Sequence, residues 1–222
     1  MKKALLLFLI IEIFFLQNML CQTLNADSLT LNKLNTISQF LHLSATDKIA
    51  DIGTGSGYSL VPIANQDPNI FFTVEDIDSS RLNKKNLLKR IKTSEGKASI
   101  DKFNIVYGTE ISTNLPSATF NKVLLFDVVH EFSDRNIMLQ DVKRILTNNG
   151  SVFIEEILVH HSIKKDRGCN FPFLTEDAFK QLMADNKFKL VKEQITFDTG
   201  KNRYMKIFEY IATSSLVRKV TN

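Results

Sequence analysis

The 222-residue sequence contains no tryptophan and only two cysteines, four prolines and eight glycines. Its two cysteines, Cys21 and Cys169, lie far apart and belong to no metal-type or redox-type pair, so we expect neither a disulfide framework nor a metal site. The 28 basic and 24 acidic residues give a net charge of +4 and form no basic block. Nucleic-acid binding is therefore not expected.

What the sequence does contain is an ordinary balance for a folded domain. Hydrophobic residues make up 44% and charged residues 23% of the chain, and seventeen phenylalanines supply an aromatic-rich core. A chain of this length can bury one sizeable core. We find no internal repeat, linker or low-complexity segment after the first residues, so residues 23 to 222 are expected to form one domain.

The first 21 residues differ from the rest of the chain. Lys2 and Lys3 precede an apolar run from Ala4 to Leu16 that only Glu12 interrupts. This pattern is typical of a secretory signal peptide, and the run is shorter than the roughly 20 residues that span a bilayer. We expect an exported protein, periplasmic or extracellular. The alternatives are membrane association, through residues 1 to 21 as an uncleaved anchor or a lipid-attached form, and a buried helix.

The remaining sequence alternates apolar strands with amphipathic helices. Five strands are predicted at Lys48 to Asp51, Ile70 to Glu75, Phe103 to Tyr107, Lys122 to Asp127 and Ser151 to Ile157. Helices are predicted at Ser28 to Leu43, Tyr58 to Ala64, Ser79 to Ile91, Ser133 to Leu146 and Glu176 to Asp185. Two last strands, Lys189 to Phe197 and Tyr204 to Ala212, flank a turn and predict an antiparallel hairpin. The pattern predicts a doubly wound α/β fold with a mostly parallel, seven-stranded sheet.

A run of alternate glycines lies where the first predicted strand ends and a helix begins. It comprises Asp51, Gly53, Gly55 and Gly57. Glycine permits backbone conformations closed to other residues and lets a ligand approach the main chain, while a helix N-terminus offers free N–H groups. The spacing differs from the G-x-G-x-x-G of dinucleotide folds, which favours a ligand without a pyrophosphate. A glycine-rich turn without a ligand is the alternative.

Two adjacent carboxylates, Glu75 and Asp76, come at the end of the second predicted strand. A carboxylate at this position can accept hydrogen bonds from both ribose hydroxyls of an adenosine. We favour Asp76, because it is the first residue after the predicted strand, and keep Glu75 as the alternative. A solvated acidic turn would look the same in the sequence.

Four motifs in order carry a family resemblance: IADIGTGSGY, FFTVEDID, VYGTEISTNLPSATFNKVLLFDVVHEF and RILTNNGSVFIEE. Together they resemble the successive motifs of the class I S-adenosylmethionine-dependent methyltransferases, whose fold is Rossmann-like with an antiparallel seventh strand. The resemblance covers about residues 45 to 157. The chain departs from the family's usual Pro-Gly-Gly turn at Asn148, Asn149 and Gly150, which still suit a tight turn.

The resemblance implies S-adenosylmethionine as the cofactor and a role for each matching residue. The methionine and ribose portions would be held by Asp51, Gly53, Gly55 and Gly57. Asp76, or Glu75 in its place, would bind the ribose hydroxyls. Thr109 and Glu110 would lie near the adenine amino group, and Asp127 and Val128 beside the methyl donor.

His130 and Glu131 follow the fourth predicted strand and are the best-placed candidates for a catalytic base. A base is needed only where the acceptor is a hydroxyl, a thiol or a protonated amine. His130 could equally be a packed or solvated residue of the loop. We expect a methyltransferase for a small-molecule or lipid-like acceptor. The alternative is an exported, non-catalytic ligand-binding domain of the same fold.

Overall fold

The computed structural model describes residues 31–67, 69–94, 96–161, 172–198, 200 and 202–213. The predicted export segment, residues 1 to 21, and both cysteines lie outside these ranges. The chain divides into two compact units, Met1–Phe40 and Leu41–Asn222. In the first unit the described residues, from 31 on, are helical, as predicted. No helix in the described ranges is long and apolar enough to cross a membrane.

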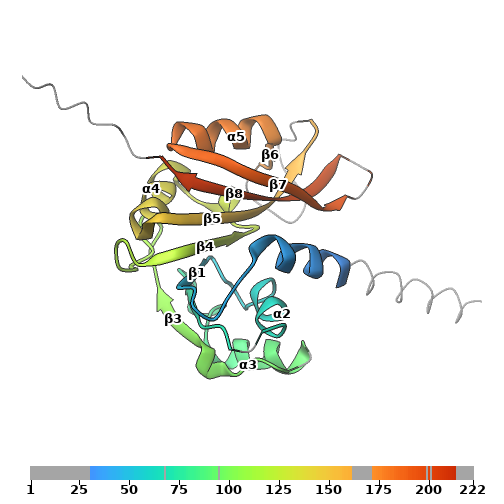
Figure 1. The fold of residues 1–222 in the computed structure, drawn as a ribbon, viewed down its shortest axis with the longest axis vertical. Coiled ribbons are helices and arrows are strands. Elements are labelled where there is room, and N and C mark those ends of the chain that lie inside the picture. The colour runs from blue at the N-terminus through green and yellow to red at the C-terminus, as the bar shows by residue number, and fades with distance from the viewer. Residues whose placement is uncertain are drawn as a thin grey trace, which may run out of the picture. The chain divides into compact units, whose positions relative to one another are not determined.

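The second unit is built on one mixed sheet with the strand order β3-β2-β1-β4-β5-β8-β7 (Figure 1). Its strands are β1 (Ile49–Ile52), β2 (Phe72–Asp76), β3 (Phe103–Tyr107), β4 (Phe120–Phe126), β5 (Leu146–Val159), β7 (Phe188–Asp198) and β8 (Arg203–Ala212). The first five are parallel, whereas β8 runs antiparallel to both β5 and β7. The predicted parallel sheet and its C-terminal hairpin are confirmed.

The sheet also has a short strand that the sequence did not predict, β6 (Leu174–Thr175), which pairs with the end of β5. A strand of two residues is too short to show an alternation of hydrophobic and polar residues, so only its pairing with β5 in the tertiary structure reveals it. β5 itself begins earlier than predicted. Leu146 was expected to end a helix, but it is extended, is buried and pairs with Phe120 of β4.

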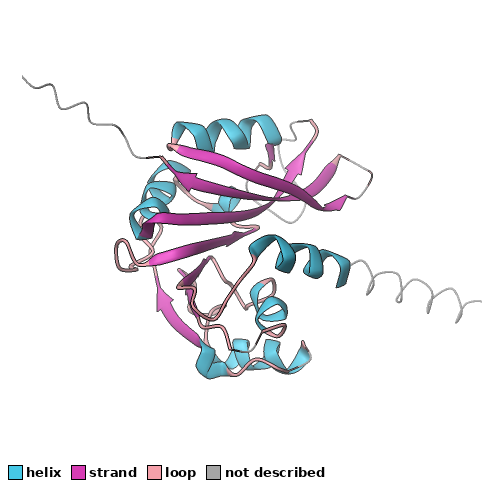
Figure 2. Cartoon of the chain, in the orientation of Figure 1, coloured by secondary structure: helices cyan, strands magenta, loops and turns pink. Residues whose placement is uncertain are grey.

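Helices connect the strands (Figure 2). They are α2 (Leu60–Ala64), α3 (Lys84–Thr93), α4 (Arg135–Ile145) and α5 (Glu176–Asp185), with short 3₁₀ turns η1 (Ile100–Lys102) and η2 (Val129–Glu131). The start of α3 was predicted five residues too early. The Asn83 side chain accepts a hydrogen bond from the Asn86 N–H, and this N-cap fixes the start at Lys84. Asp134 caps α4 in the same way.

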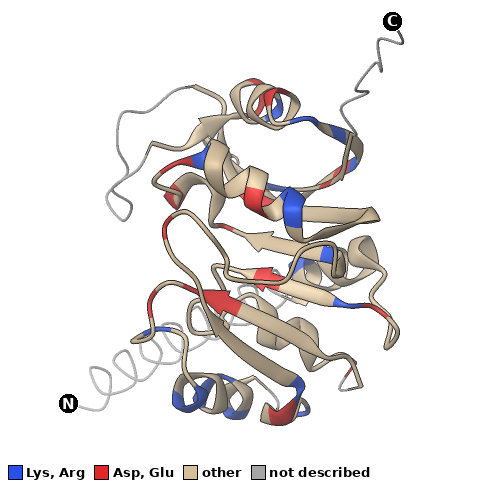
Figure 3. Ribbon diagram, turned by 90° about the vertical axis from the view of Figure 1, so that its left-hand side faces the viewer, with Lys and Arg blue, Asp and Glu red and all other residues tan. Residues whose placement is uncertain are grey.

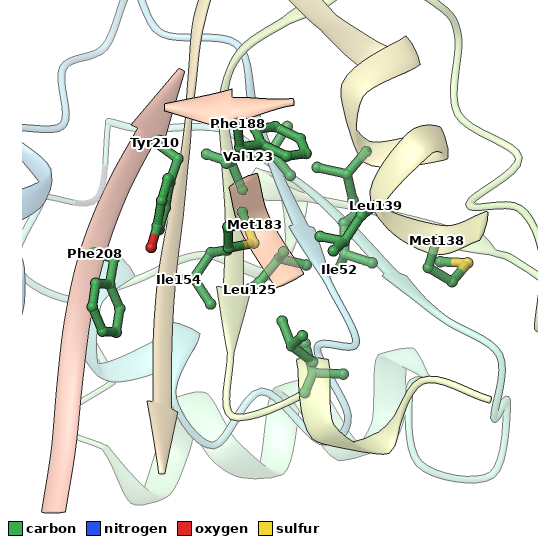
Figure 4. Close-up of a cluster of buried hydrophobic side chains, with 14 of the residues drawn as sticks. Ile52, Val123, Leu125, Met138, Leu139, Ile154, Met183, Phe188, Phe208 and Tyr210 are labelled. Carbon is green, nitrogen blue, oxygen red and sulfur yellow. The ribbon is translucent and has the colours of Figure 1, made fainter. Parts of the chain in front are cut away.

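A buried hydrophobic cluster joins β1, β4, β5 and β8 to α4 and α5 (Figure 4). Val123, Leu125 and Ile154 from β4 and β5 are fully buried in it, together with Leu139 of α4 and Met183 of α5. This packing holds the carboxyl ends of β1, β4 and β5 in fixed relation. The chain winds from β1 to β2 and β3 on one side and to β4 and β5 on the other, and ligands of such sheets bind at this switch point.

Candidate functional site

A cavity of about 510 Å³ opens at the carboxyl ends of β1, β2 and β4. That volume lies within the range of small-molecule sites, roughly 300 to 1,000 Å³. Ten of the twelve predicted site residues line it: Asp51, Gly53, Gly55, Glu75, Asp76, Thr109, Glu110, Asp127, Val128 and Glu131. Gly57 and His130 are not among the lining residues. Acidic residues, red in Figure 3, mark the ends of strands at this side of the sheet.

The three glycines of the β1–α2 loop all have positive φ, as the alternate-glycine pattern predicted. A Cβ at Gly53 would lie 2.3 Å from Cγ2 of Val128, because the end of β4 approaches the loop closely. A Cβ at Gly55 would meet only the guanidinium of Arg81, at 3.2 Å. Gly57 has a different role, since its Cβ would collide with side chains of α2 and α3. It allows helix packing and does not form the cavity wall.

Asp51 and Glu75 place buried carboxyl groups in the cavity without positive partners. One oxygen of each, Oδ1 of Asp51 and Oε1 of Glu75, is buried and has no hydrogen-bond partner among the described residues. Burial, reinforced by the charge of Asp76, raises the pKa of Asp51 to about 7 and that of Glu75 to about 8. Each carboxyl group therefore has one oxygen that can accept a hydrogen bond from a ligand. A cationic ligand bound beside these groups would favour their deprotonated, negatively charged forms.

Asp76 differs from its neighbour because both of its carboxyl oxygens already accept backbone hydrogen bonds. Gly55 N donates to Oδ2 at 2.7 Å, and Asp78 N donates to Oδ1 at 2.8 Å. The carboxylate thus joins the glycine loop to the turn after β2, and Asp76 itself lines the cavity. Both candidates for the ribose contact lie at the cavity. Asp76, at the end of β2, is hydrogen-bonded to the glycine loop, and Glu75 lies against Gly108.

Thr109 and Glu110 lie in a tight turn after β3. The Thr109 N–H donates to the Ser112 carbonyl oxygen at 2.7 Å, and the two residues form an isolated bridge. This turn presents both predicted residues to the cavity.

Asp127 and Val128 form the cavity wall at the end of β4. Asp127 has a φ of +56°, which is uncommon for a residue with a side chain, and its N–H donates to the Glu155 carbonyl oxygen at 2.7 Å. This conformation ends the strand abruptly and brings Val128 against Gly53. The strain is therefore located where the two central strands meet the site.

His130 lies behind the cavity wall in η2, only 3% exposed, and forms a pair with a residue that the sequence did not single out. Its Nδ1 is 2.5 Å from Oε1 of Glu156 on β5. Glu156 is fully buried. The other ring nitrogen, Nε2, lies 3.9 Å from Oε1 of Glu131, whose side chain is 47% exposed and lines the cavity. Phe173 packs edge-on against the imidazole ring.

The surroundings of His130 determine its charge and tautomer. Burial by itself lowers the pKa of the imidazole, but the hydrogen bond and charge of Glu156, with Asp127 and Glu131 nearby, raise it above its ordinary value. In the neutral form, Nδ1–H donates to Glu156, which leaves Nε2 as the acceptor. This arrangement suits a base that takes a proton on the side facing Glu131.

Asp127, His130 and Glu156 together offer three potential metal-ligand atoms within 4.8 Å of one another. Ligands bound to one ion at about 2.0 to 2.2 Å are separated from each other by about 3 Å or more. The 2.5 Å between His130 Nδ1 and Glu156 Oε1 is shorter and is that of a hydrogen bond. We therefore describe the group as a hydrogen-bonded histidine–carboxylate pair.

Sequence reasoning missed several residues that complete the site. Glu156 is the most important, and its signal was the pair Glu155–Glu156 inside an otherwise apolar strand, where two acidic residues are unusual. Tyr58, Arg81, Phe132 and Met138 also line the cavity. They come from four separate segments with no shared motif.

A family model described as a methyltransferase domain matches residues 43–211. A search of curated proteins gives no match. Several solved structures are similar in fold. A SAM-dependent methyltransferase from Aquifex aeolicus has a TM-score of 0.62 at 15% identity over 81% of this chain and 89% of its own.

Two further solved structures share the fold, and they are named for different activities. The glycopeptide N-methyltransferase MtfA, complexed with sinefungin, has a TM-score of 0.65 at 11% identity over 82% of this chain and 93% of its own. The [4+2]-cyclase SpnF has a TM-score of 0.65 at 9% identity over 82% of this chain and 81% of its own. Likeness at these identities establishes the fold and leaves the reaction to be argued from the site.

Proposed function

The chain belongs to the class I methyltransferase family, and from this membership we propose that it transfers a methyl group from S-adenosylmethionine to a small acceptor. The observation that carries the proposal is the cavity at the switch point, where the positive-φ glycine loop meets two buried carboxyl groups, each with one oxygen that has no hydrogen-bond partner among the described residues. A sinefungin complex of a neighbour with this fold agrees with such a ligand.

The site residues fit S-adenosylmethionine in charge and in shape. The cofactor carries a sulfonium and an ammonium group, and Asp51 and Glu75 are buried acceptors that each have one oxygen without a hydrogen-bond partner among the described residues. Gly53 and Gly55 leave the main chain accessible at the wall of the cavity. We assign Asp51 and the glycine loop to the methionine and ribose portions, and Asp76 to the ribose hydroxyls.

Asp76→Ala is expected to lower the affinity for S-adenosylhomocysteine by about tenfold or more, since hydrogen bonds to a charged group are each worth roughly 1.5 to 3 kcal/mol. Isothermal titration of the purified chain measures this. Asp101→Ala, at an exposed carboxylate in η1 outside the cavity lining, is the matched control and should bind as the unmodified protein does. Glu75→Ala is measured alongside, and a loss in that variant alone would reassign the ribose contact to Glu75.

The affinity for S-adenosylmethionine relative to S-adenosylhomocysteine is expected to rise with pH between about 6 and 8.5. Asp51 and Glu75, with pKa values raised to about 7 and about 8, lose their protons in this window. Their carboxylates favour the ligand with the additional sulfonium charge. Titrations of both ligands at several pH values give the ratio. Glu75→Gln should reduce the rise of the affinity ratio in the upper part of this pH range. A ratio that does not depend on pH would contradict these ionisations.

The bound cofactor supplies an electrophilic methyl group on a positively charged sulfur. The protein's residues position the acceptor and receive its proton. We assign the base to His130, held by Glu156 with Nε2 directed toward Glu131. Glu131 lines the cavity and its Oε1 lies 3.9 Å from Nε2, so we assign the acceptor's proton a path to His130 by way of this carboxylate.

Methyl transfer is tested by incubating the protein and labelled S-adenosylmethionine with host extracts from cytoplasmic and exported fractions. We expect label in a small-molecule or lipid product. Tight cofactor binding with no labelled product in either fraction would favour the alternative, a non-catalytic ligand-binding domain. Loss of cofactor binding itself would contradict the proposed function.

A further inference from the structure

One part of the cavity, formed by the segment after β4, combines apolar walls with a carboxylate. We call it the acceptor end and define it by Glu131, Phe132, Ser133 and Met138. Phe132 and Met138 pack against the main hydrophobic cluster, so their exposed atoms form a fixed apolar wall. Glu131 stands beside that wall with its side chain 47% exposed.

No positive side chain among the described lining residues faces this end. Arg81 is the only lysine or arginine of the described cavity wall, and its guanidinium lies at the glycine loop, next to Gly55. Arg135 is near in sequence, but it donates its hydrogen bonds to the carbonyl oxygens of Val129 and His130. Glu131, whose side chain is 47% exposed, is therefore the charged side chain that defines the acceptor end.

Resting on the proposed function, we infer that the methyl acceptor is an apolar amine that binds in its ammonium form at Glu131. Its apolar body lies against Phe132 and Met138, and its positive charge offsets the carboxylate of Glu131. An acceptor with a carboxylate or phosphate at the same position would face a like charge, which costs affinity.

The same contact explains how a protonated amine becomes a nucleophile. One N–H bond of the ammonium breaks, and its proton passes across Glu131 to Nε2 of His130, where a new N–H bond forms. The positive charge moves from the ammonium to the imidazole, which Glu156 stabilises from the opposite nitrogen. The amine is left neutral, with a free electron pair for the methyl group.

The test uses three probes with one phenyl body and different charge: phenethylamine, 2-phenylethanol and phenylacetate. Each is titrated calorimetrically into the full-length protein saturated with S-adenosylhomocysteine. We expect phenethylamine to bind about tenfold or more tighter than 2-phenylethanol, and phenylacetate to bind weakest, with the preference falling as salt is raised. Glu131→Gln should remove the preference, whereas Asp101→Asn, an exposed carboxylate in η1, should keep it.

The outcomes separate this inference from the proposed function. Failure of S-adenosylhomocysteine to bind in the first step would contradict the proposed function. With that ligand bound, equal or tighter binding of 2-phenylethanol or phenylacetate would overturn the amine assignment. So would no binding of phenethylamine, or a preference that persists in Glu131→Gln.

Discussion

Gly53→Ala is expected to lower the affinity for S-adenosylhomocysteine by about a hundredfold, or about 3 kcal/mol. The new Cβ would lie 2.3 Å from Cγ2 of Val128, which also lines the cavity. Relief of this contact requires either the glycine loop or the end of β4 to move. Both line the site, so the cofactor pocket changes shape. Titration calorimetry on the purified variant measures the loss.

Gly200→Ala separates steric contact from backbone strain. Gly200 has a φ of +64°, close to the +71° of Gly53, but nothing lies within 4 Å of its added Cβ. Both variants carry the cost of a left-handed alanine, roughly 1 to 2 kcal/mol, which thermal unfolding reports. Only Gly53→Ala should lose cofactor affinity. A second substitution in the Gly53→Ala variant, Val128→Ala, removes the clashing methyl group and should restore part of the lost cofactor affinity. Unchanged binding in Gly53→Ala would contradict the assignment of the glycine loop.

His130→Ala is expected to reduce methyl transfer by roughly 10² to 10⁴ and to leave cofactor affinity nearly unchanged, as for a group that acts in proton transfer. The imidazole is buried and does not line the cavity, so its loss changes the base without removing a cofactor contact. Transfer of labelled methyl groups and titration of S-adenosylhomocysteine are measured on the same preparation. If His130 only packs, thermal stability falls and both measurements change together.

Glu156→Gln tests the partner of this base. The amide keeps the shape of the side chain but carries no charge. In the unmodified protein the charge of Glu156 holds Nδ1–H and raises the pKa of His130, so this pKa should fall in the variant. Turnover should fall by roughly 10², since orientation of the imidazole is lost. The remaining activity should also show its acidic limb shifted to lower pH, because the free base persists at lower pH when the His130 pKa falls. An unchanged pH profile would assign Glu156 a structural role only.

Most of the fold followed from hydrophobic periodicity, which is clearest in the central strands β1 and β2, where nearly every residue is buried. The predicted strand Phe103 to Tyr107 and the predicted helix Glu176 to Asp185 agree with β3 and α5 at both ends. Errors occurred where a single side chain determines a boundary. Asn83 delays the start of α3, and the pairing of Leu146 with Phe120 turns a predicted helix end into the start of β5.

The cavity-lining residues of β1, β2 and the glycine loop were equally predictable from the sequence, since they lie at or next to two adjacent strand ends. The carboxyl ends of parallel strands meet at one edge of the sheet, so Asp51, the glycines and Asp76 are expected to lie close together. Gly57 shows the limit of the motif. It shares the positive φ of its neighbours, yet it is needed for packing against Leu87 and Val61 and not for the cavity.

The sequence by itself determined the order of the main strands and helices, the position of the glycine loop and the carboxylates at the end of β2, because these depend on local pattern. Only the tertiary structure decided which residue His130 contacts. Of the adjacent Glu155 and Glu156, strand alternation places one on each face, and it is Glu156 that meets His130 from β5. In the sequence, His130 and Glu156 are separated by helix α4. The hydrogen bond between them forms only when β4 and β5 pair in register.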